Sequence, residues 1–401
     1  MYTRAVAANA GRPYALLAVL TATGWAANHF SAIVPVLHEQ RGYSEQLLAA
    51  VFGLYAVGLL PGLLGGGTLS DQIGRAKIAV PGACLAAGGT IILLLWHDPV
   101  GLAVGRLVVG LGAGATFSAG TAWMADLDGS HGATMAGVAL TSGFGGGPVV
   151  SGLVAVALPA PLVIPFVVSL VLSVAAIGGL VASRRRLTPT ATPFGAAEDP
   201  RQDVHVRTSG RALRWALPIA PFVFVSAAVG VFTLPARLPA SYPGPILAGM
   251  AGGLVLGTGL AAQFAARRRG RPYGVHGLAC TCAGLVLMGG AGDSVGLVVF
   301  LACSVLLGLG YGLCLHGGLS DLDRWAPPAR RGALTGMFYV TTYLGFGVPL
   351  LLEVVEPSFG TRPPLFALAA LAAVAGLVRA GAGRRSLSPQ LGACAPARRA
   401  G

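Results

Sequence analysis

Gly67-Thr-Leu-Ser-Asp71-Gln-Ile-Gly74-Arg75-Ala-Lys77 decides the fold, because it is a short charged segment between two long apolar runs. The runs Gln46–Gly66 and Ile78–Trp96 each come close to the ~20 residues that a helix needs to cross the hydrocarbon core of a bilayer. Asp71 can lie against a helix N-terminus, where exposed N–H groups favour an anion, and Gly74 permits a tight turn. The segment therefore predicts two membrane-crossing helices joined by a tight turn, with Arg75 free to pair with an acidic group on a neighbouring helix.

The composition of the whole chain favours lipid as its solvent. Of the 401 residues, 54% are apolar and only 10% are charged, and the mean hydropathy is +0.73. A soluble domain carries about 25% charged residues, so this chain has too few polar groups to cover a water-facing surface. Its 61 glycines also suit membrane helices, in which small residues let backbones approach closely.

Twelve apolar runs are long enough to cross a membrane as helices, whereas barrel strands would be about ten residues long. The sequence therefore predicts an all-α membrane protein of twelve transmembrane helices. The expected spans are Tyr14–Leu37, Gln46–Gly66, Ile78–Trp96, Val100–Met124, Thr134–Leu158, Val163–Ser183, Trp215–Leu234, Ile246–Ala266, Gly274–Gly292, Val295–Ser320, Ala333–Val355 and Pro363–Gly383.

The net charge of +13 is distributed as the positive-inside rule requires. With a cytoplasmic N-terminus, the outer loops hold only Arg41, Arg237 and Arg362, Arg106 lies within a span, and the remaining members of the 27 Lys and Arg residues fall on the inner side. This segregation predicts that both termini are cytoplasmic. Because the basic residues recur between apolar runs and do not gather in one domain, they do not indicate nucleic-acid binding. The first span is expected to be retained, since it is longer than a signal-peptide core.

The cysteines and short motifs indicate neither a cofactor nor an enzyme. Five of the six cysteines lie in spans and Cys394 lies in the inner tail, so disulfides and a metal site are not expected. No nucleophile–base or metal cluster converges, and the chain lacks the G-x-x-x-x-G-K-[ST] loop that would bind ATP. Lys77 is the only lysine beside many arginines, which suggests a GC-rich bacterial source and hence the inner (plasma) membrane.

The chain is organised as two halves of six helices. We expect an N-terminal half (1–183), a polar cytoplasmic linker (184–214), a C-terminal half (215–383) and a cytoplasmic tail (384–401). Three matches recur across the linker in the same order: Gly-Arg at 74 and 270, Gly-Leu-Gly-x-Gly at 110 and 308, and Gly-Phe-Gly at 143 and 345, followed by Pro148 and Pro349. Such pseudo-symmetric halves typify transporters, whose substrate site lies near the midplane between the repeats.

The opening segment strongly resembles the G-x-L-[SA]-D-x-x-G-R-[KR] loop of the major facilitator superfamily. The resemblance implies a gating role for Gly67, Asp71, Gly74, Arg75 and Lys77 that latches the outward-facing state, with Asp126 or Asp128 as the partner of Arg75. Family members often continue with Arg-Gly at the start of the fifth helix. This chain has His131-Gly132 there, while its second half keeps Asp321 and Arg331-Gly332.

Two further motifs extend the resemblance. Arg106-Leu-Val-Val-Gly110-Leu-Gly112-Ala-Gly114 is similar to the family's R-x-x-x-G-x-G motif, in which the Arg is linked to proton transfer or anchoring; bonding to neighbouring carbonyls is the alternative. In the fifth helix, Gly143, Gly147, Pro148 and Gly152 resemble a motif associated with drug:proton antiporters, although Ser151 replaces one glycine. These small residues can seal the outer side of the cavity or form an ordinary packing seam.

Several polar and aromatic side chains within the spans are candidates for proton or substrate binding. Asn28, His29 and Arg106 are placed by helical rise in the outer third of the bundle, and His29 can titrate near neutrality or simply bond a neighbouring helix. Tyr55, Tyr311, His316, Tyr339 and Tyr343 could line the cavity or only pack. No Asp or Glu lies deep in a span, which leaves neutral or anionic substrates open.

These patterns together favour a proton-coupled carrier that exports a small organic compound by alternating access. The expected partners are the substrate, protons and the lipid bilayer, with the chain acting as a monomer. Two alternatives remain at this stage: uptake of a metabolite by proton symport, and a non-transporting membrane receptor or scaffold.

Overall fold

The computed structural model describes residues 14–183, 208–239, 241–270, 273–327 and 330–392, and within them every regular element is a helix. Twelve helices or helical segments in these ranges are long and apolar enough to cross a membrane, which confirms the predicted all-α fold. Most of the predicted linker, the N-terminus and the end of the tail lie outside the described residues.

The first six spans run from Tyr14 to Ser183. α6 is continuous by hydrogen bonding, but non-helical backbone at Asp128 and Gly129 divides it into the fourth and fifth spans. The elements are α2 (Tyr14–Asn28), η1 (His29–Ala32), α3 (Val34–Arg41), α4 (Glu45–Ile73), α5 (Arg75–Leu95), α6 (Pro99–Ala157) and α7 (Ile164–Ser183).

The last six spans follow the linker. They begin at Ser209, because Thr208 caps a helix by accepting a hydrogen bond from Arg211 N, so the last part of the expected linker is helical. The elements are α8 (Ser209–Ala216), α9 (Ala220–Ala228), η3 (Val229–Thr233), α10 (Leu234–Ala236), α11 (Gly244–Arg269), α12 (Gly274–Ala291), α13 (Leu297–Trp325), α14 (Arg331–Tyr343), η5 (Leu344–Gly347), α15 (Val348–Phe359) and α16 (Arg362–Gly392).

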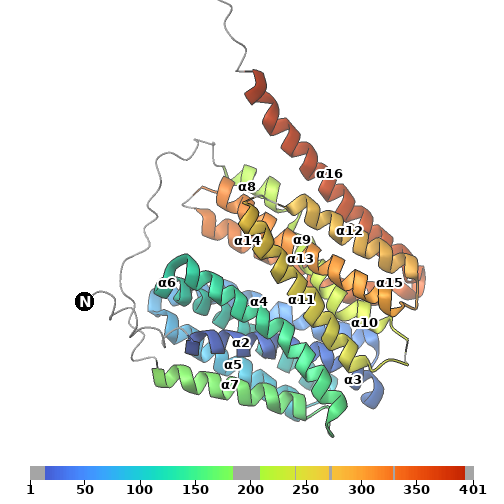
Figure 1. Cartoon of the computed structure of the whole chain (residues 1–401). Helices are drawn as coiled ribbons and strands as arrows, with labels where there is room; N and C mark the ends of the chain where they lie inside the picture. The colour runs from blue at the N-terminus through green and yellow to red at the C-terminus, as the bar shows by residue number, and fades with distance from the viewer. Residues whose placement is uncertain (1–13, 184–207, 240, 271–272, 328–329, 393–401) are drawn as a thin grey trace, which may run out of the picture.

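Figure 1 shows the two halves as neighbouring bundles, the first in blue to green and the second in yellow to red. They meet chiefly where α11 packs along α6 and where α15 packs on α4. We call the end of the molecule that carries Arg75 and Arg267 the basic end, and the end that carries Glu45 and Glu353 the acidic end.

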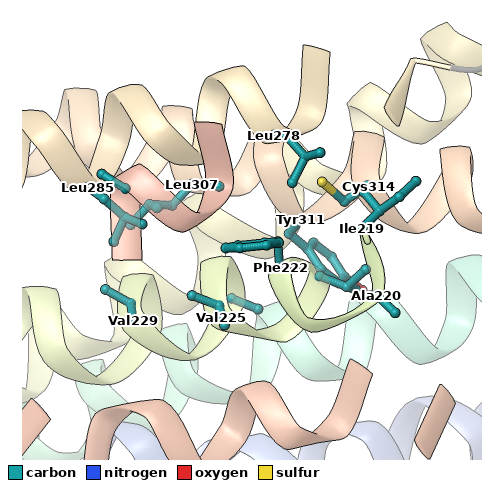
Figure 2. Packing of buried hydrophobic residues seen from close by; sticks show 14 of the residues in the cluster. Ile219, Ala220, Phe222, Val225, Val229, Leu278, Leu285, Leu307, Tyr311 and Cys314 are labelled. Atoms are coloured by element: carbon teal, nitrogen blue, oxygen red, sulfur yellow. The ribbon is translucent and has the colours of Figure 1, made fainter. Parts of the chain in front are cut away.

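One apolar core lies in the second half and two lie mainly in the first half, one of which also includes Ala228 and Phe232 of the second half. In the second half, buried residues of α9, η3, α12 and α13 interdigitate, with Phe222 and Val225 facing Tyr311 and Leu307 (Figure 2). Burying such side chains does not by itself drive helix association in lipid, so close packing must supply much of the stability.

Three spans contain an irregular turn. The 3₁₀ turn η1 interrupts the first span and the π turn η3 interrupts the seventh, at corresponding places in the two halves. A second 3₁₀ turn, η5, precedes Pro349 in the eleventh span. Such turns leave backbone groups outside the regular i→i−4 pattern and often mark functional hinges.

Candidate translocation pathway and its gates

An aromatic cluster lies between the halves at mid-height. The Phe224 ring of α9 stacks on Tyr343 at 4.6 Å between centroids and lies 4.8 Å from Phe346 and 6.0 Å from Tyr311. Phe224, Tyr343 and Phe346 are only partly buried, although they stand in the interior of the bundle. Their exposed faces therefore make an aromatic lining between the halves.

The first half contributes to the same cluster through α4. The ring of Phe346 lies 6.1 Å from Tyr55 and 5.7 Å from Phe52, and Phe52 lies 5.0 Å from Phe232 of η3. The Tyr55 hydroxyl is buried without a hydrogen-bond partner among the described residues. The cluster thus joins both halves through rings that can stack on a planar molecule.

Four of the five side chains predicted from sequence as cavity candidates come together here. Tyr311 and Tyr343 contact Phe224, Tyr55 contacts Phe346, and Tyr339 precedes Tyr343 by about one turn of α14. His316 lies further along α13 and is partly buried. Within the described residues, no group of three or more His, Cys, Asp or Glu side chains could hold a metal ion.

The sequence reasoning missed the phenylalanines of the two Gly-Phe-Gly repeats. Phe144 of α6 packs against the core of the second half, and Phe346 of η5 packs against the core of the first half. The two residues occupy matching positions in the repeat, and Phe144 also packs against the core of its own half. The sequence signal for these two phenylalanines is the Gly-Phe-Gly repeat itself, of which only the glycines and the following prolines contributed to the predicted site.

Arg106 is fully buried in the first half, beside the aromatic cluster. Its guanidinium donates to the backbone oxygens of Ala27 (2.8 Å) and Phe52 (3.2 Å). It also lies 4.7 Å from the ring centre of Tyr55 and 4.9 Å from that of Phe30. Among the described residues it forms no salt bridge, so carbonyl oxygens and ring faces stabilise the cation. This geometry matches the anchoring alternative.

Asn28 and His29 make contacts within the first half. The Asn28 amide donates to Phe144 O (2.8 Å), which ties α2 to α6. The His29 Nδ1–H donates to Trp25 O (3.1 Å), and its ring packs edge-on against Phe166 of α7. His29 interacts electrostatically with Arg106, but it faces a peripheral helix of its own half. Both residues therefore remain candidates whose described contacts are structural.

The charged motif at the basic end is assembled within the first half. Arg75 Nε donates to Asp126 at 2.9 Å, and its Nη1 donates to Ser70 at 2.9 Å and pairs with Asp71. Gly74 has φ +107°, a conformation that favours glycine and lets Arg75 turn back toward α4. Of the two expected partners, Asp126 contacts Arg75, while Asp128 lies at the kink 3.9 Å from His131.

The corresponding acid in the second half has a partner that the motif comparison did not anticipate. Asp321 is buried and pairs with Arg379 of α16, which also donates to Trp215 O. The side chain of Arg331, its motif neighbour, lies outside the described side chains. The two halves therefore share acid positions at the basic end, but the second half uses its acid to hold its own last helix.

The glycine–proline motif of α6 contacts two different helices. Gly143 and Gly147 pack against α2 near Trp25. One turn beyond, a side chain at Gly152 would collide with the Pro245 carbonyl of α11, and a Cβ at Gly249 would lie 2.6 Å from Pro148 O. Gly244, at the start of α11, likewise abuts Pro35 of α3. The motif is thus part of a backbone-to-backbone seam between the halves toward the acidic end.

Comparison with known proteins agrees with this architecture. The family model for the Major Facilitator Superfamily matches residues 14–348. Crystal structures of a mutant of a peptide transporter POT in complex with sulfate and of the POT family transporter PepTSo superpose with TM-scores of 0.76 and 0.71, at 15% and 14% identity. Each superposition covers 93% of this chain. The covered share of the other chain is 94% for the peptide transporter POT and 98% for PepTSo.

A curated relative matches over a short segment. Multidrug resistance protein MdtL of Klebsiella pneumoniae (strain 342) is 29% identical over 84 residues, which is 21% of this chain and 21% of the relative's length. The twelve apolar spans together with the family match define a multi-pass membrane transporter. The chain belongs to the Major Facilitator Superfamily.

Proposed function

We propose that this protein is a secondary active transporter that exports a small organic compound in exchange for protons, by alternating access. The basic end faces the cytoplasm and the acidic end faces outward, in the plasma membrane of a bacterium, because most basic residues flank the spans at the basic end. The short match to a multidrug resistance protein supports the same class of function.

The observation that carries this proposal is the seam between α6 and α11. Pro148 and Gly152 bring the two backbones together toward the acidic end, while partly exposed rings remain at mid-height. A carrier must close one end while its central site is occupied, and a seam of small residues closes without long side chains to rearrange. The motif therefore serves as the outer seal of an exporter.

The charged motif at the basic end supports the complementary gate. In the described part of the chain, Arg75 pairs only with Asp71 and Asp126, both of its own half. These carboxylates are substantially exposed, so they remain available to the second half. Closing the basic end would bring the α14 side of the second half toward this motif, and the acidic end would then be free to open.

The test uses inside-out vesicles whose lumen is acidified by respiration, with a fluorescent acridine that is quenched by the pH gradient. Planar aromatic compounds of negative, neutral and positive charge are added in turn. Antiport predicts that a substrate releases luminal protons and restores the fluorescence. Symport would acidify the lumen further, and saturable binding without any proton or compound flux would favour a receptor.

A matched pair of variants links the flux to the aromatic cluster. Tyr343→Ala removes a central ring, whereas Tyr242→Ala removes an exposed ring in the loop before α11. We expect substrate-dependent proton release to fall in the first variant and to persist in the second. Equal flux in both variants would remove the cluster from the pathway.

A further inference from the structure

Arg106 is a buried cation that has no acidic partner in the described part of the chain. It is 0% exposed and donates two hydrogen bonds, both to backbone oxygens, although a guanidinium carries five N–H donors. Its Nε is buried and has no acceptor among the described residues. The nearest acid along α6 is Asp98, which lies eight residues earlier, or ~12 Å of helix, and accepts from the first N–H groups of α6. A positive charge without a counter-ion therefore remains in the interior of the first half.

Tyr55 of α4 adds a second buried group without a partner. Its ring centre lies 4.7 Å from the guanidinium carbon of Arg106, and the residue is 2% exposed. The hydroxyl has no hydrogen-bond partner among the residues that the structure describes. A buried hydroxyl without a partner costs stability, and such groups are rare enough to call for an explanation when they occur. Two neighbouring side chains, from α4 and α6, thus hold donors that a ligand could satisfy.

These two side chains are connected to the aromatic lining between the halves. The ring centroids of Tyr55 and Phe346 are 6.1 Å apart. Phe52 lies 5.7 Å from Phe346, and its ring centre lies 5.8 Å from the guanidinium carbon of Arg106. Phe346 in turn lies 4.8 Å from Phe224, and both rings are partly exposed. An aromatic surface with a few polar groups at one side is typical of a small-molecule site.

The unbalanced charge at this side of the lining selects among planar molecules. A cation stacked on the rings is repelled by Arg106, and a neutral molecule leaves the guanidinium without a counter-ion. An anionic group can accept a charge-assisted hydrogen bond from the Tyr55 hydroxyl and also compensates the charge of Arg106. Because water is largely excluded from the interior, both interactions are stronger there than at the protein surface.

We propose that the aromatic lining binds a planar aromatic compound with a negative charge, such as an aromatic carboxylate. The Tyr55 hydroxyl donates to the anionic group, and Arg106 supplies the charge that selects it. This inference rests on the proposed function, whose substrate class it narrows. The membrane potential, negative inside, drives an anion outward and a proton inward, so it favours both movements of such an exchange.

The test compares three probes with the same ring system: naphthoate, naphthamide and naphthylmethylammonium, each substituted at the same ring carbon. Their affinities for the full-length protein in detergent are measured by equilibrium dialysis at neutral pH, and protein-free micelles correct for partitioning. We expect naphthoate to bind about tenfold more tightly than naphthamide or better, as a hydrogen bond to a charged group gives. The ammonium compound should bind most weakly.

Two variants change the binding groups, and one matched control removes a hydroxyl elsewhere. Tyr55→Phe should lower the preference for naphthoate over naphthamide about tenfold, without a fall in melting temperature, because the lost hydroxyl has no partner. Arg106→Gln removes the charge but keeps an amide donor for the carbonyl oxygens, and should abolish the preference. In the control Tyr43→Phe, the lost hydroxyl donates to His97 O at 2.8 Å in the loops of the acidic end. This variant should keep the preference and lose some stability.

Equal affinity of the wild-type protein for naphthoate and naphthamide would overturn the proposal, and so would the absence of measurable naphthoate binding. An unchanged preference in Tyr55→Phe, or an equal loss of preference in Tyr43→Phe, would also overturn it. Selective binding of naphthoate by a protein that moves no compound in the vesicle assay would refute the proposed transport function and leave the anion site standing. Export of the neutral or cationic probe alone would do the reverse.

Discussion

Replacing Gly152 by alanine adds one methyl group to the seam between the halves. The new Cβ would collide with the Pro245 carbonyl oxygen and lie 2.9 Å from the Pro245 carbonyl carbon. Both are backbone atoms, so no side-chain rotation can relieve the contact, and α6 and α11 must separate. Overpacking of this kind costs ~1–3 kcal/mol.

This cost applies chiefly to the conformation in which the acidic end is closed, because the clash disappears once the helices part. A differential of ~1–3 kcal/mol changes a two-state equilibrium about 5- to 150-fold. We therefore expect Gly152→Ala to shift the population toward an open acidic end by that factor, with a smaller effect on the melting temperature than a core cavity would have.

The assay is the distance between spin labels attached at Leu158→Cys and Ser358→Cys, at the ends of α6 and α15, measured by pulsed electron paramagnetic resonance. The control variant is Gly146→Ala. Gly146 lies on the same helix with nothing within 4 Å of its Cβ position, so its alanine has the same helix propensity without the clash. Equal distance distributions in Gly152→Ala and Gly146→Ala would refute the argument that the motif closes this end by backbone packing.

Three more variants test separate parts of the structure. Arg379→Met removes the ion-pair partner of the buried Asp321 and should destabilise the protein by ~3–5 kcal/mol. Combining Arg379→Met with Asp321→Asn should recover part of the lost stability in a thermal unfolding assay. No recovery would mean that the two residues are not coupled. Asp71→Asn removes one of the two carboxylates that pair with Arg75. The transport rate, measured as flux, should fall, while the substrate affinity, measured by equilibrium binding, should stay within about threefold of the wild-type value. A larger loss of affinity with normal flux would contradict a gating role. Tyr343→Ala removes a stacked ring and should weaken binding of a planar aromatic substrate by about 2- to 12-fold, the equivalent of ~0.5–1.5 kcal/mol, whereas Tyr242→Ala should bind normally.

The number and class of the helices were predictable because the bilayer imposes one strong constraint. Each span needs about 20 apolar residues with its backbone hydrogen bonds satisfied internally, and the twelve apolar runs met that requirement. The boundaries were less accurate where a cap or turn extends a helix into polar sequence. The seventh span starts at Ser209, capped by Thr208, six residues before the predicted Trp215, and the first span continues past Leu37 to Arg41.

The orientation of each helix about its own axis was not predictable. These spans are apolar on nearly all sides, so periodicity cannot indicate which face meets which neighbour. His29 was therefore a reasonable cavity candidate, yet its ring packs on Phe166. For the same reason the partner of Asp321 was not evident: Arg379 lies 58 residues away, and only the spatial order of the helices brings the two together.

The motifs were more informative than the residue types. The spacing around Asp71 and Gly74 identified the turn that brings Arg75 to Asp126, and the Gly-Phe-Gly repeat contained two rings that cross the interface.

The irregular turns η1 and η3 have a consequence for how the molecule moves. In the first half η1 separates α2 from the eight-residue α3, and in the second half η3 separates α9 from the three-residue α10, which ends the seventh span. Because backbone bonding is irregular at these turns, α3 and α10 can tilt at the acidic end while the remainder of each half stays fixed. Local bending is thus available to the acidic end in addition to whole-half rocking, so distances measured at the two ends should relax with different rate constants.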